Sequence, residues 1–451
     1  MVADGPRRHF GVLSFTGSGH LNPMIALGLE LQERGHKVTF FEKPKIEKRI
    51  RAAGLDFRTI GKQESRFKGK GPEMPASGLF SELATLRFNL GRIRHDLESY
   101  FNETEPALRE TGVDALIVNE IAITGPTLAE LLGLPYFIIS TSVPHNFGWN
   151  AYPAWSGYRF RRGWYSLLLN EVLEVSSVKM HGPIRSIVNR FRASRRLAPV
   201  SGINMEYPPL AQITQLAKCL DLPRSSFPER FRYTGPFARK GARPQIDFPW
   251  DRLDGRPLIY ASLGTTRNSR ADVLQLIAEA CKEIDAQLVI SLGGRFDAAI
   301  FGPLPGEPIV VEFAPQLEIL KRASLVITHA GPNTVFETLM EGKPMVAVPI
   351  AHDQPAVAAR LGRLGIAEVL PVMRLSEGLI RKAAVKVLTD GSYREAAEKM
   401  QRELQSLNGV QLAAEIIEES LTRLELERKP LRNGLNVSGA SLQTLSSSGR
   451  G

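Results

Sequence analysis

The chain has few of the features that mark several large protein classes. Only Cys219 and Cys281 are cysteines among its 451 residues, too few for a disulfide framework and far from any metal-ligand spacing. No apolar run approaches the length of a membrane span, and the N-terminus lacks the apolar core of a secretion signal. The sequence also has no Asp-x-Asp metal motif. These absences predict a cytoplasmic protein without a structural disulfide, a membrane anchor or a required metal ion.

The length predicts two or three domains, and 43% hydrophobic with 23% charged residues is typical of a globular protein. A stretch rich in proline and polar residues separates two halves that each show strand and helix patterns. The predicted parts are an N-terminal domain over residues 1–221, a linker over 222–250, a C-terminal domain over 251–390, helices over 391–427 and a disordered tail over 428–451.

The net charge of +10 suggests an anionic partner, and the positive charge is unevenly distributed. Between Trp155 and Arg196 lie nine Lys and Arg residues but only two glutamates, with aromatic residues among them. Such a segment fits peripheral contact with an anionic membrane, whereas a solvated helical face around a ligand pocket explains it without any membrane. No zinc-finger spacing or RNP-like sequence supports nucleic-acid binding.

The first segment with a candidate functional residue lies near the N-terminus. The pattern predicts a strand from His9 to Phe15, a helix from Met24 to Arg34 and a further strand, which together indicate a doubly wound sheet. The glycine-rich turn TGSGHLNP lacks the GK[ST] ending of a P-loop and does not fit GxGxxG. It exposes His20 where ligands of open α/β sheets bind, although a histidine that only caps the turn fits the same pattern.

The most informative stretch covers residues 313–354, FAPQLEILKRASLVITHAGPNTVFETLMEGKPMVAVPIAHDQ. A buried strand from Ala323 to Thr328 is followed by a turn, a helix that opens near Asn333, and a second apolar strand after Gly342. This pattern predicts a βαβ unit. We expect its ligand-binding residues at the turn between the first strand and the helix.

The start of that helix has the groups of an anion site. Free backbone N–H groups and the positive end of the helix dipole attract a phosphate. His329, Asn333 and Thr334 can each donate to a diphosphate oxygen, and Glu337 can accept from a sugar hydroxyl. Taken singly, Asn333 as a helix cap and His329 as a core histidine explain these residues as well. We favour a nucleotide diphosphate site because FAPQ precedes the unit and Asp-Gln follows it.

With those flanking residues, the stretch resembles the donor-sugar signature of the nucleotide-sugar glycosyltransferases of the GT-B fold, in the UDP-glycosyltransferase family. The resemblance implies two Rossmann-like, doubly wound α/β domains that face each other across a cleft. Phe313 stands where tryptophan is frequent, and Pro332 stands where plant members have tryptophan. The resemblance therefore favours a bacterial member, such as those that glycosylate macrolides or zeaxanthin.

The same resemblance assigns roles to the donor-site residues. Phe313 would stack on the base, Gln316 would contact it, His329 would bind the diphosphate and Glu337 would hold the ribose. Asn333 and Thr334 would bind phosphate oxygens. The remaining donor contacts would be Ala314, Gly331, the phosphate-contacting pair Gly264 and Thr265, and the sugar-binding pair Asp353 and Gln354.

The resemblance extends to the N-terminal turn, because GSGHLNPMIALGLEL looks like the family's first loop. Its histidine, here His20, is implied to be the general base that deprotonates the acceptor. The family's partner is an aspartate after a later strand, and that position falls on Asn119 or, with one residue missing in the loop, on Glu120. A neutral amide cannot stabilise an imidazolium as a carboxylate does, so we favour Glu120 as the partner.

The implied reaction is a metal-independent, inverting transfer of a hexose from UDP-glucose, another UDP-sugar or a TDP-sugar, without a further cofactor. His145, Phe147 and Trp149 predict an aromatic wall for a small lipophilic acceptor with a hydroxyl group. Two other interpretations stay open. A lipid glycosyltransferase at the membrane surface would explain the basic segment, and a nucleotide-sugar-binding protein with impaired catalysis would explain Asn119.

Overall fold

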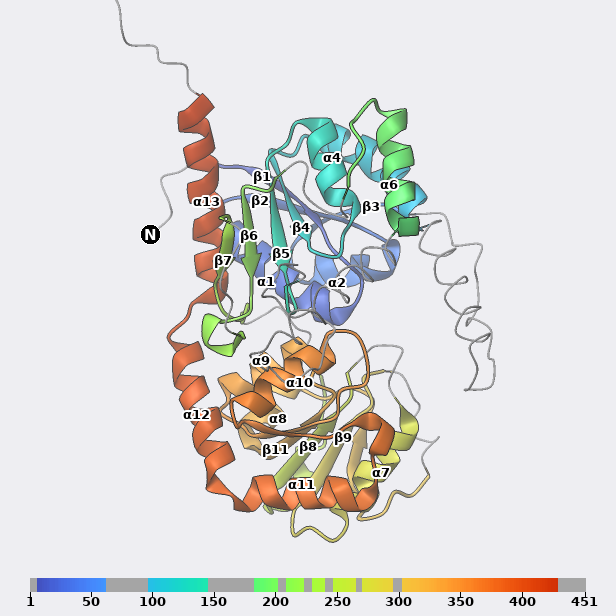
Figure 1. The fold of residues 1–451 in the computed structure, drawn as a ribbon, viewed down its shortest axis with the longest axis vertical. Coiled ribbons are helices and arrows are strands. Elements are labelled where there is room, and N and C mark those ends of the chain that lie inside the picture. Colours follow the sequence, from blue (N-terminus) through green and yellow to red (C-terminus); the bar gives the residue numbers. More distant parts are fainter. Residues whose placement is uncertain are drawn as a thin grey trace, which may run out of the picture.

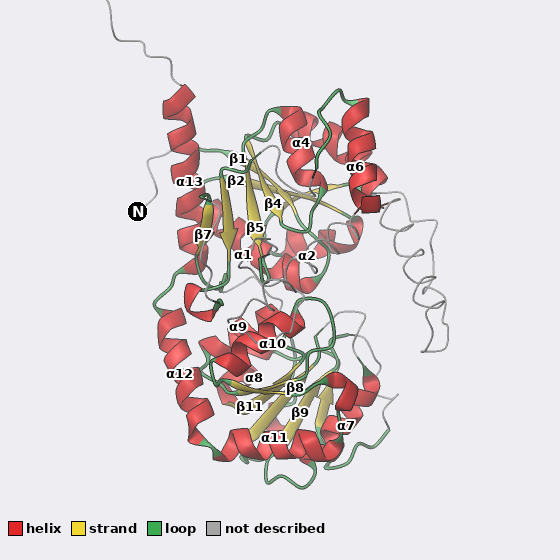
Figure 2. Ribbon diagram, viewed as in Figure 1, coloured by secondary structure: helices red, strands yellow, loops and turns green. Residues whose placement is uncertain are grey.

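The computed structural model describes residues 6–61, 96–144, 182–201, 208–222, 229–239, 246–264, 270–294 and 302–428. The predicted tail beyond residue 428 lies outside these ranges. Within them the chain forms two parallel sheets in two domains, one above the other in Figure 1. Helices lie on both faces of each sheet (Figure 2). The prediction of two doubly wound α/β domains is confirmed.

The N-terminal domain is built on a seven-stranded sheet in the order β3-β2-β1-β4-β5-β6-β7, with neighbouring strands parallel throughout. Its strands are β1 (His9–Leu13), β2 (Lys37–Glu42), β3 (Asp56–Thr59), β4 (Ala115–Asn119), β5 (Tyr136–Ser140), β6 (Ala211–Thr214) and β7 (Phe231–Tyr233). The chain order reverses between β1 and β4, and in open α/β sheets ligands bind at the carboxyl ends of such a pair.

Two helical layers cover this sheet. One apolar cluster joins it to α1 (Ser18–Glu33), α13 (Gly409–Arg428) and α2 (Glu47–Ala52), which follows the short 3₁₀ helix η1 (Pro44–Ile46). A second cluster on the opposite face joins it to the helical residues 96–111, α4 (Thr124–Leu132) and α6 (Gly182–Ser194). Burial on both faces explains why β4 and β5 are continuous apolar runs.

The C-terminal domain has a six-stranded parallel sheet in the order β10-β9-β8-β11-β12-β13. Its strands are β8 (Leu258–Ser262), β9 (Gln287–Ser291), β10 (Ile309–Val311), β11 (Ala323–Thr328), β12 (Met345–Ala347) and β13 (Ala367–Val369). One face is covered by α7 (Ala271–Cys281) and α11 (Glu377–Thr389), the other by α8 (Gln316–Arg322), α9 (Pro332–Met340), α10 (Gln354–Arg363) and α12 (Gly391–Gln405). The short 3₁₀ helices η2 (Lys218–Leu220), η3 (Trp250–Arg252) and η5 (Val372–Arg374) lie in the connections.

Helix α1 begins earlier than the sequence predicted. It starts at Ser18 rather than Met24, so His20 lies in its first turn instead of in a loop. Pro23 lies inside the helix and has no N–H group with which to bond the carbonyl of Gly19, four residues before it. The prediction of a turn through Pro23 was wrong because the helix tolerates this lost bond, and the freed carbonyl takes another donor.

The predicted linker over residues 222–250 also needs correction. Residues Phe231–Tyr233 pair with β6 and form β7, the edge strand of the first sheet. A strand of only three residues is too short to show an alternating or apolar pattern, so the sequence alone cannot distinguish it from a loop. The N-terminal sheet therefore extends into the stretch that was assigned to the linker.

The chain passes between the domains at two places that touch each other. The first crossing follows β7, at Gly235, and the second lies at Gly409, the first residue of α13. A side chain at Gly409 would overlap the backbone of Gly235. Helix α13 then packs against α1 and β6, with Ala413 and Ile417 fully buried (Figure 1).

A packed interface joins the two domains. Val143 and Leu216 of the N-terminal domain belong to the same buried cluster as Val335 of the C-terminal domain. Beside them Arg360 of α10 forms a buried ion pair of 2.6 Å with Asp221. A buried ion pair with good geometry fixes the relative position of its two partners, because leaving either charge unpaired would be costly.

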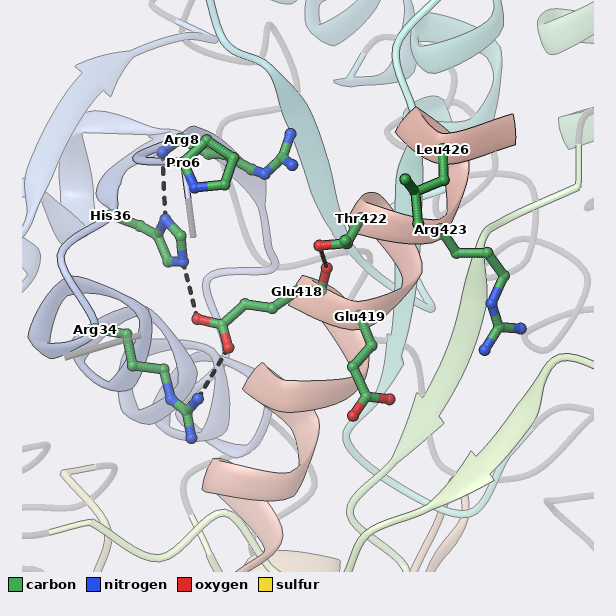
Figure 3. Close-up of a pocket in the computed structure, with 9 residues that line it drawn as sticks. All are labelled: Pro6, Arg8, Arg34, His36, Glu418, Glu419, Thr422, Arg423 and Leu426. Carbon is green, nitrogen blue, oxygen red and sulfur yellow. Dashed lines mark hydrogen bonds and ion pairs between the residues drawn. The ribbon is translucent and has the colours of Figure 1, made fainter. Parts of the chain in front are cut away.

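A hollow of about 450 Å³ lies where α13 meets the amino ends of β1 and β2 (Figure 3). In its wall, the Arg8 backbone N–H donates to His36 Nδ1 at 3.2 Å, and His36 Nε2 lies 3.0 Å from Glu418. Arg34 donates to the same carboxylate at 2.9 Å. These bonds fasten α13 to the N-terminal domain. Ligands of parallel sheets bind at the carboxyl ends, so this hollow lies at the opposite edge from the predicted chemistry.

A buried carboxylate stands at the carboxyl end of β2. Glu42 is 1% exposed, and its Oε1 accepts hydrogen bonds from the Tyr100 hydroxyl and the Lys43 N–H. Among the described residues its Oε2 has no hydrogen-bond partner. Burial raises the pKa of Glu42 to about 6, because the hydrogen bonds from Tyr100 and Lys43 offset the desolvation only in part.

We expect Glu42→Gln to stabilise the protein at pH 8. The folded-state pKa lies above the ordinary value of 4.5, so the folded chain binds the proton more tightly and loses stability as the pH rises through about 6. The penalty above that pH is about 2 kcal/mol. The variant should therefore have a higher unfolding midpoint than the unmodified protein at pH 8 and an equal one near pH 4.5. A lower midpoint at pH 8 would contradict the prediction.

Candidate functional site

The turn between β11 and α9 holds the main donor-site candidates of the C-terminal domain. Ala330 has a positive φ of 62°, and its N–H donates to Thr328 Oγ1 at 3.2 Å. This tight turn brings His329 back over the start of α9. Gly331 is the N-cap residue and Pro332 the first helical residue, so the backbone N–H groups of Asn333 and Thr334 remain for an anion.

His329 is 6% exposed and faces two glycines. A Cβ atom at Gly264 would lie 2.6 Å from its Nε2, and one at Gly331 would lie 2.7 Å from its Cε1. Its Nδ1 has no hydrogen-bond partner in the part of the chain that the structure describes. Burial lowers the pKa of His329 to about 4, an effect that the backbone of Ser262 opposes only in part. The ring is therefore neutral at physiological pH and can donate one hydrogen.

Gly264 lies at the carboxyl end of β8, the strand next to β11, and its φ of 76° suits only glycine well. Two neighbouring strand ends thus meet at His329. Thr265, the other residue predicted for this phosphate-contacting loop, lies outside the described residues.

The residues predicted to hold the base and ribose lie at the start of α8 and inside α9. Phe313 is 45% exposed and its ring covers Gly294, where any side chain would overlap it, while Ala314 is buried beside it. Gln316 Nε2 donates to Glu337 Oε2 at 2.6 Å, and the Tyr260 hydroxyl donates to Gln316 Oε1 at 3.1 Å. The predicted base and ribose contacts are therefore bonded to each other.

The sugar-binding pair follows β12. Asp353 is the N-cap residue of α10 and is partly exposed. Gln354 is 3% exposed, and its Oε1 accepts from the N–H groups of Ile350 and Ala351 at 2.9 Å each. The amide oxygen of Gln354 thus orders the loop before α10, which leaves its NH₂ group as the part suited to a sugar hydroxyl.

The N-terminal domain presents a second set of residues at its carboxyl edge. His20 Nδ1 lies 2.7 Å from the Thr141 hydroxyl, just beyond the end of β5. Asn119, at the end of β4 and fully buried, donates from Nδ2 to the same hydroxyl at 3.1 Å. Asn119 therefore reaches His20 through Thr141.

Glu120, which the sequence favoured as the partner of His20, forms a hydrogen bond with a residue of β6. Its Oε1 accepts from Gln212 Nε2 at 3.3 Å, on β6. The carboxylate lies beside Gln212 because Asn119 occupies the last position of β4, and the next residue turns toward the other side of the edge.

Phe15 adds an apolar surface beside His20. It is 49% exposed, and its ring lies edge-on to the imidazole with the ring centroids 5.6 Å apart. An exposed aromatic ring next to a polar group is the combination expected of a site for an amphipathic small molecule. His145, Phe147 and Trp149, which predict an aromatic wall, lie outside the described residues.

The two sets of residues meet between the domains. Asn333 Nδ2 donates to the Gly19 carbonyl at 2.7 Å, and Asn333 Oδ1 accepts from Gln215 Nε2 at 3.0 Å. Gln215 follows β6 and also donates to the carbonyl of Thr141. The start of α9 therefore touches the segment that carries His20.

The arrangement includes three residues that the sequence analysis did not single out: Phe15, Thr141 and Gln215. Each follows the carboxyl end of a strand, at β1, β5 and β6 respectively. The rule that ligands bind at the carboxyl ends of parallel strands could have identified these positions. It could not have identified their partners, which depend on how the domains pack.

The described part of the basic segment binds the protein itself. Arg192 is 2% exposed and donates to Glu130 at 2.8 Å, Arg195 pairs with Glu105, and Arg185 donates to the carbonyl of Ser201. In this part a folded helix α6 accounts for the charges, whereas membrane contact stays a prediction. Over the described ranges, no helix is both long and apolar enough to span a membrane. Nor do the described residues contain a group of three or more His, Cys, Asp or Glu that could hold a metal ion.

Two family profiles match the chain. One, described as UDP-glucoronosyl and UDP-glucosyl transferase, matches residues 220–405, and the other, described as glycosyltransferase family 28 N-terminal domain, matches residues 12–143. The zeaxanthin glucosyltransferase of Pantoea ananas is 28% identical over 434 residues, which cover 91% of this chain and 95% of that protein.

Solved structures have the same fold. The glycotransferase of kitacinnamycin superposes with a TM-score of 0.72 at 22% identity, covering 92% of this chain and 99% of that one. The spinosyn rhamnosyltransferase SpnG complexed with thymidine diphosphate superposes with a TM-score of 0.66 at 18% identity, covering 93% and 100%. At these identities the likeness establishes the arrangement of the two domains.

Proposed function

Because the chain is a nucleotide-sugar glycosyltransferase of the GT-B fold, in the UDP-glycosyltransferase family, we propose that it transfers a hexose from a UDP- or TDP-sugar to a hydroxyl of a small lipophilic acceptor. His20 is the general base, and the anomeric configuration of the sugar is inverted. UDP-glucose is the first donor to test, because the matching profile is named for UDP-glucosyl transfer.

The observation that carries the proposal is the contact between the domains. The helix start that carries Asn333 lies within hydrogen-bond distance of Gly19, the residue before His20. A diphosphate at that helix start would hold the attached sugar beside the imidazole. Such positioning of two reactants is a large part of the catalysis of group transfer.

In the proposed reaction His20 takes the proton of the acceptor hydroxyl, and the acceptor oxygen forms a bond to the anomeric carbon. The bond from that carbon to the diphosphate oxygen breaks, and its electron pair stays on the nucleoside diphosphate. The N-terminus of α9, His329, Asn333 and Thr334 stabilise this growing charge by preorganised hydrogen bonds. A single in-line displacement accounts for the inversion, and no step is assigned to a metal ion.

Thr141 is the partner that orients the His20 ring in the proposed mechanism. When His20 Nδ1 carries the proton, it donates to Thr141 Oγ1, and Nε2 is left as the base. Asn119 donates to the same oxygen and holds the hydroxyl in place. The contact with Thr141 orients the ring and fixes which nitrogen faces the acceptor.

The apolar surface of Phe15 beside His20 supports a lipophilic acceptor. Zeaxanthin, named for one relative, is an acceptor of this kind. The acceptor class rests on Phe15 and on the predicted wall of His145, Phe147 and Trp149.

A transfer assay tests the proposal directly. Radiolabelled UDP-glucose is incubated with a panel of lipophilic alcohols, in parallel with a TDP-sugar and with and without EDTA. We expect a labelled product whose anomeric proton coupling in NMR shows a β-glycoside from the α-linked donor, at a rate that EDTA leaves unchanged. Retention of configuration, or binding of donor without any transfer, would overturn the proposed mechanism.

A further inference from the structure

The side chain of Asn333 belongs to the donor-binding turn, yet both ends of its amide are bonded to the N-terminal domain. Its Oδ1 accepts from Gln215 Nε2 at 3.0 Å, and its Nδ2 donates to the Gly19 carbonyl at 2.7 Å. Gln215 is 2% exposed, so the Gln215 end of this link is buried, whereas the bond from Asn333 to Gly19 lies at the surface. Hydrogen bonds in buried surroundings are strong, and leaving one partner unpaired is costly.

The Gly19 carbonyl is available because of Pro23. In a regular helix that carbonyl would accept from the N–H four residues later, but proline has none. A proline near the start of α1 thus creates an acceptor that points out of the helix, at the place where Asn333 arrives. The missing hydrogen bond in α1 and the bond between the domains therefore have a single cause.

The orientation of both amides is fixed by backbone groups. Gln215 Nε2 faces the carbonyl of Thr141, which can only accept, so its NH₂ group must lie on that side. Asn333 Nδ2 faces the carbonyl of Gly19 for the same reason. Neither side chain can flip without losing two hydrogen bonds. One hydrogen of the Asn333 NH₂ group is used by Gly19, and the second is left for a ligand.

Gln215 links this asparagine to the proposed base. Its NH₂ group bonds the carbonyl of Thr141, and the hydroxyl of the same Thr141 lies 2.7 Å from His20 Nδ1. Two hydrogen-bonded residues, Gln215 and Thr141, therefore connect the start of α9 to the imidazole. The apolar cluster around Leu216 and the buried pair of Asp221 and Arg360 hold the domains at this spacing.

We propose that Gln215 is a positioning residue that couples the nucleotide-sugar site to the base, by holding Asn333 toward the diphosphate and Thr141 toward His20 at the same time. This inference rests on the proposed function, because it assigns the ligand of Asn333 as a diphosphate. It makes the N-terminal domain a determinant of donor affinity, although Gln215 itself touches no donor.

The test measures nucleotide binding and transfer in a double-mutant cycle. Calorimetry with UDP and with TDP is carried out on the unmodified protein, Gln215→Met, Asn333→Ala and the double variant. We expect Gln215→Met to weaken nucleotide binding about tenfold, the loss of one buried hydrogen bond. In the Asn333→Ala background the same substitution should change nucleotide affinity less than about twofold, because the amide that Gln215 bonds is absent. The kcat for transfer should fall in Gln215→Met as well.

Gln212→Met is the matched control. Gln212 lies on β6, three residues before Gln215, and its amide is 3% exposed and bonds Glu120 and Ser140. This control should lower the unfolding midpoint as much as Gln215→Met does and leave nucleotide affinity unchanged. An undiminished effect of Gln215→Met in the Asn333→Ala background, or equal nucleotide affinity of Gln215→Met and the unmodified protein, overturns the coupling. Absence of UDP and TDP binding to the unmodified protein instead removes the proposed function itself.

Discussion

Replacing His20 by alanine is expected to lower kcat for sugar transfer by about 10²- to 10⁴-fold, the range that general-base catalysis supplies. The donor should still bind, because Ala keeps the helix and the Gly19 carbonyl that holds Asn333. The loss should therefore appear in kcat and leave the UDP dissociation constant within about twofold, since the imidazole acts on the acceptor and not on the nucleotide. Steady-state kinetics and calorimetry on the same preparation separate the two effects.

His9→Ala is the matched control for this variant. His9 lies at the amino end of β1, where its Nε2 bonds Thr39 Oγ1 at 2.8 Å, far along the strand from the carboxyl edge. It should lose some stability and keep its kcat. If His20→Ala retains its activity with an unchanged pH profile, another group is the base. If the unmodified protein binds UDP-sugar without transferring it, the chain is a binding protein with impaired catalysis.

The second large effect is expected for Gly331→Ala, which should weaken UDP binding roughly 10- to 100-fold, the cost of one or two hydrogen bonds to a charged group. The backbone at Gly331 is ordinary, with φ −65°, so strain does not arise from the main chain. The added Cβ would overlap the imidazole of His329, which is buried and cannot swing away freely. The ring should therefore be displaced from the proposed diphosphate site.

Two controls make this prediction specific. Gly378→Ala, in the first turn of α11, adds a methyl group with nothing within 4 Å and should leave UDP affinity unchanged. In a His329→Ala background, Gly331→Ala should cost little further affinity, because the ring that it displaces is absent. A full additional loss in that background would show that the methyl group acts on the nucleotide directly and that the imidazole has no part in the effect.

Much of the fold could be predicted because its signals are local. The strand from Ala323 to Thr328 matches β11 in full, since a short apolar run between polar residues is typical of a buried strand in a parallel sheet. Gly342 has a positive φ of 63° just after α9, as its position at the helix end predicts. The start of α1 was missed because Pro23 looks like a boundary from the sequence, although the helix continues through it.

The sequence could single out candidate site residues but not the pairs that they form. The resemblance singled out His20, His329 and Asn333, and all three lie at carboxyl edges. Their partners could not be found, because Thr141 is 121 residues from His20 and Gln215 is 118 residues from Asn333 in the sequence. Contacts of that range depend on strand order and on how two domains dock, which no local pattern encodes. Glu120 was favoured for its charge, and its hydrogen bond to Gln212, 92 residues away, could not be foreseen either.

The contact between Gly235 and Gly409 decides how this enzyme could be recombined with its relatives. Because both crossings lie at one point, a foreign C-terminal domain can be grafted with two junctions, near residues 235 and 409, that are already neighbours in space. The native α13 must then be retained, since Ala413 and Ile417 belong to the core of the N-terminal domain. A hybrid in which α13 also comes from the foreign protein would pack a non-native helix against α1. Such a hybrid could fail to fold for that reason alone, whichever sugar donor its C-terminal domain binds.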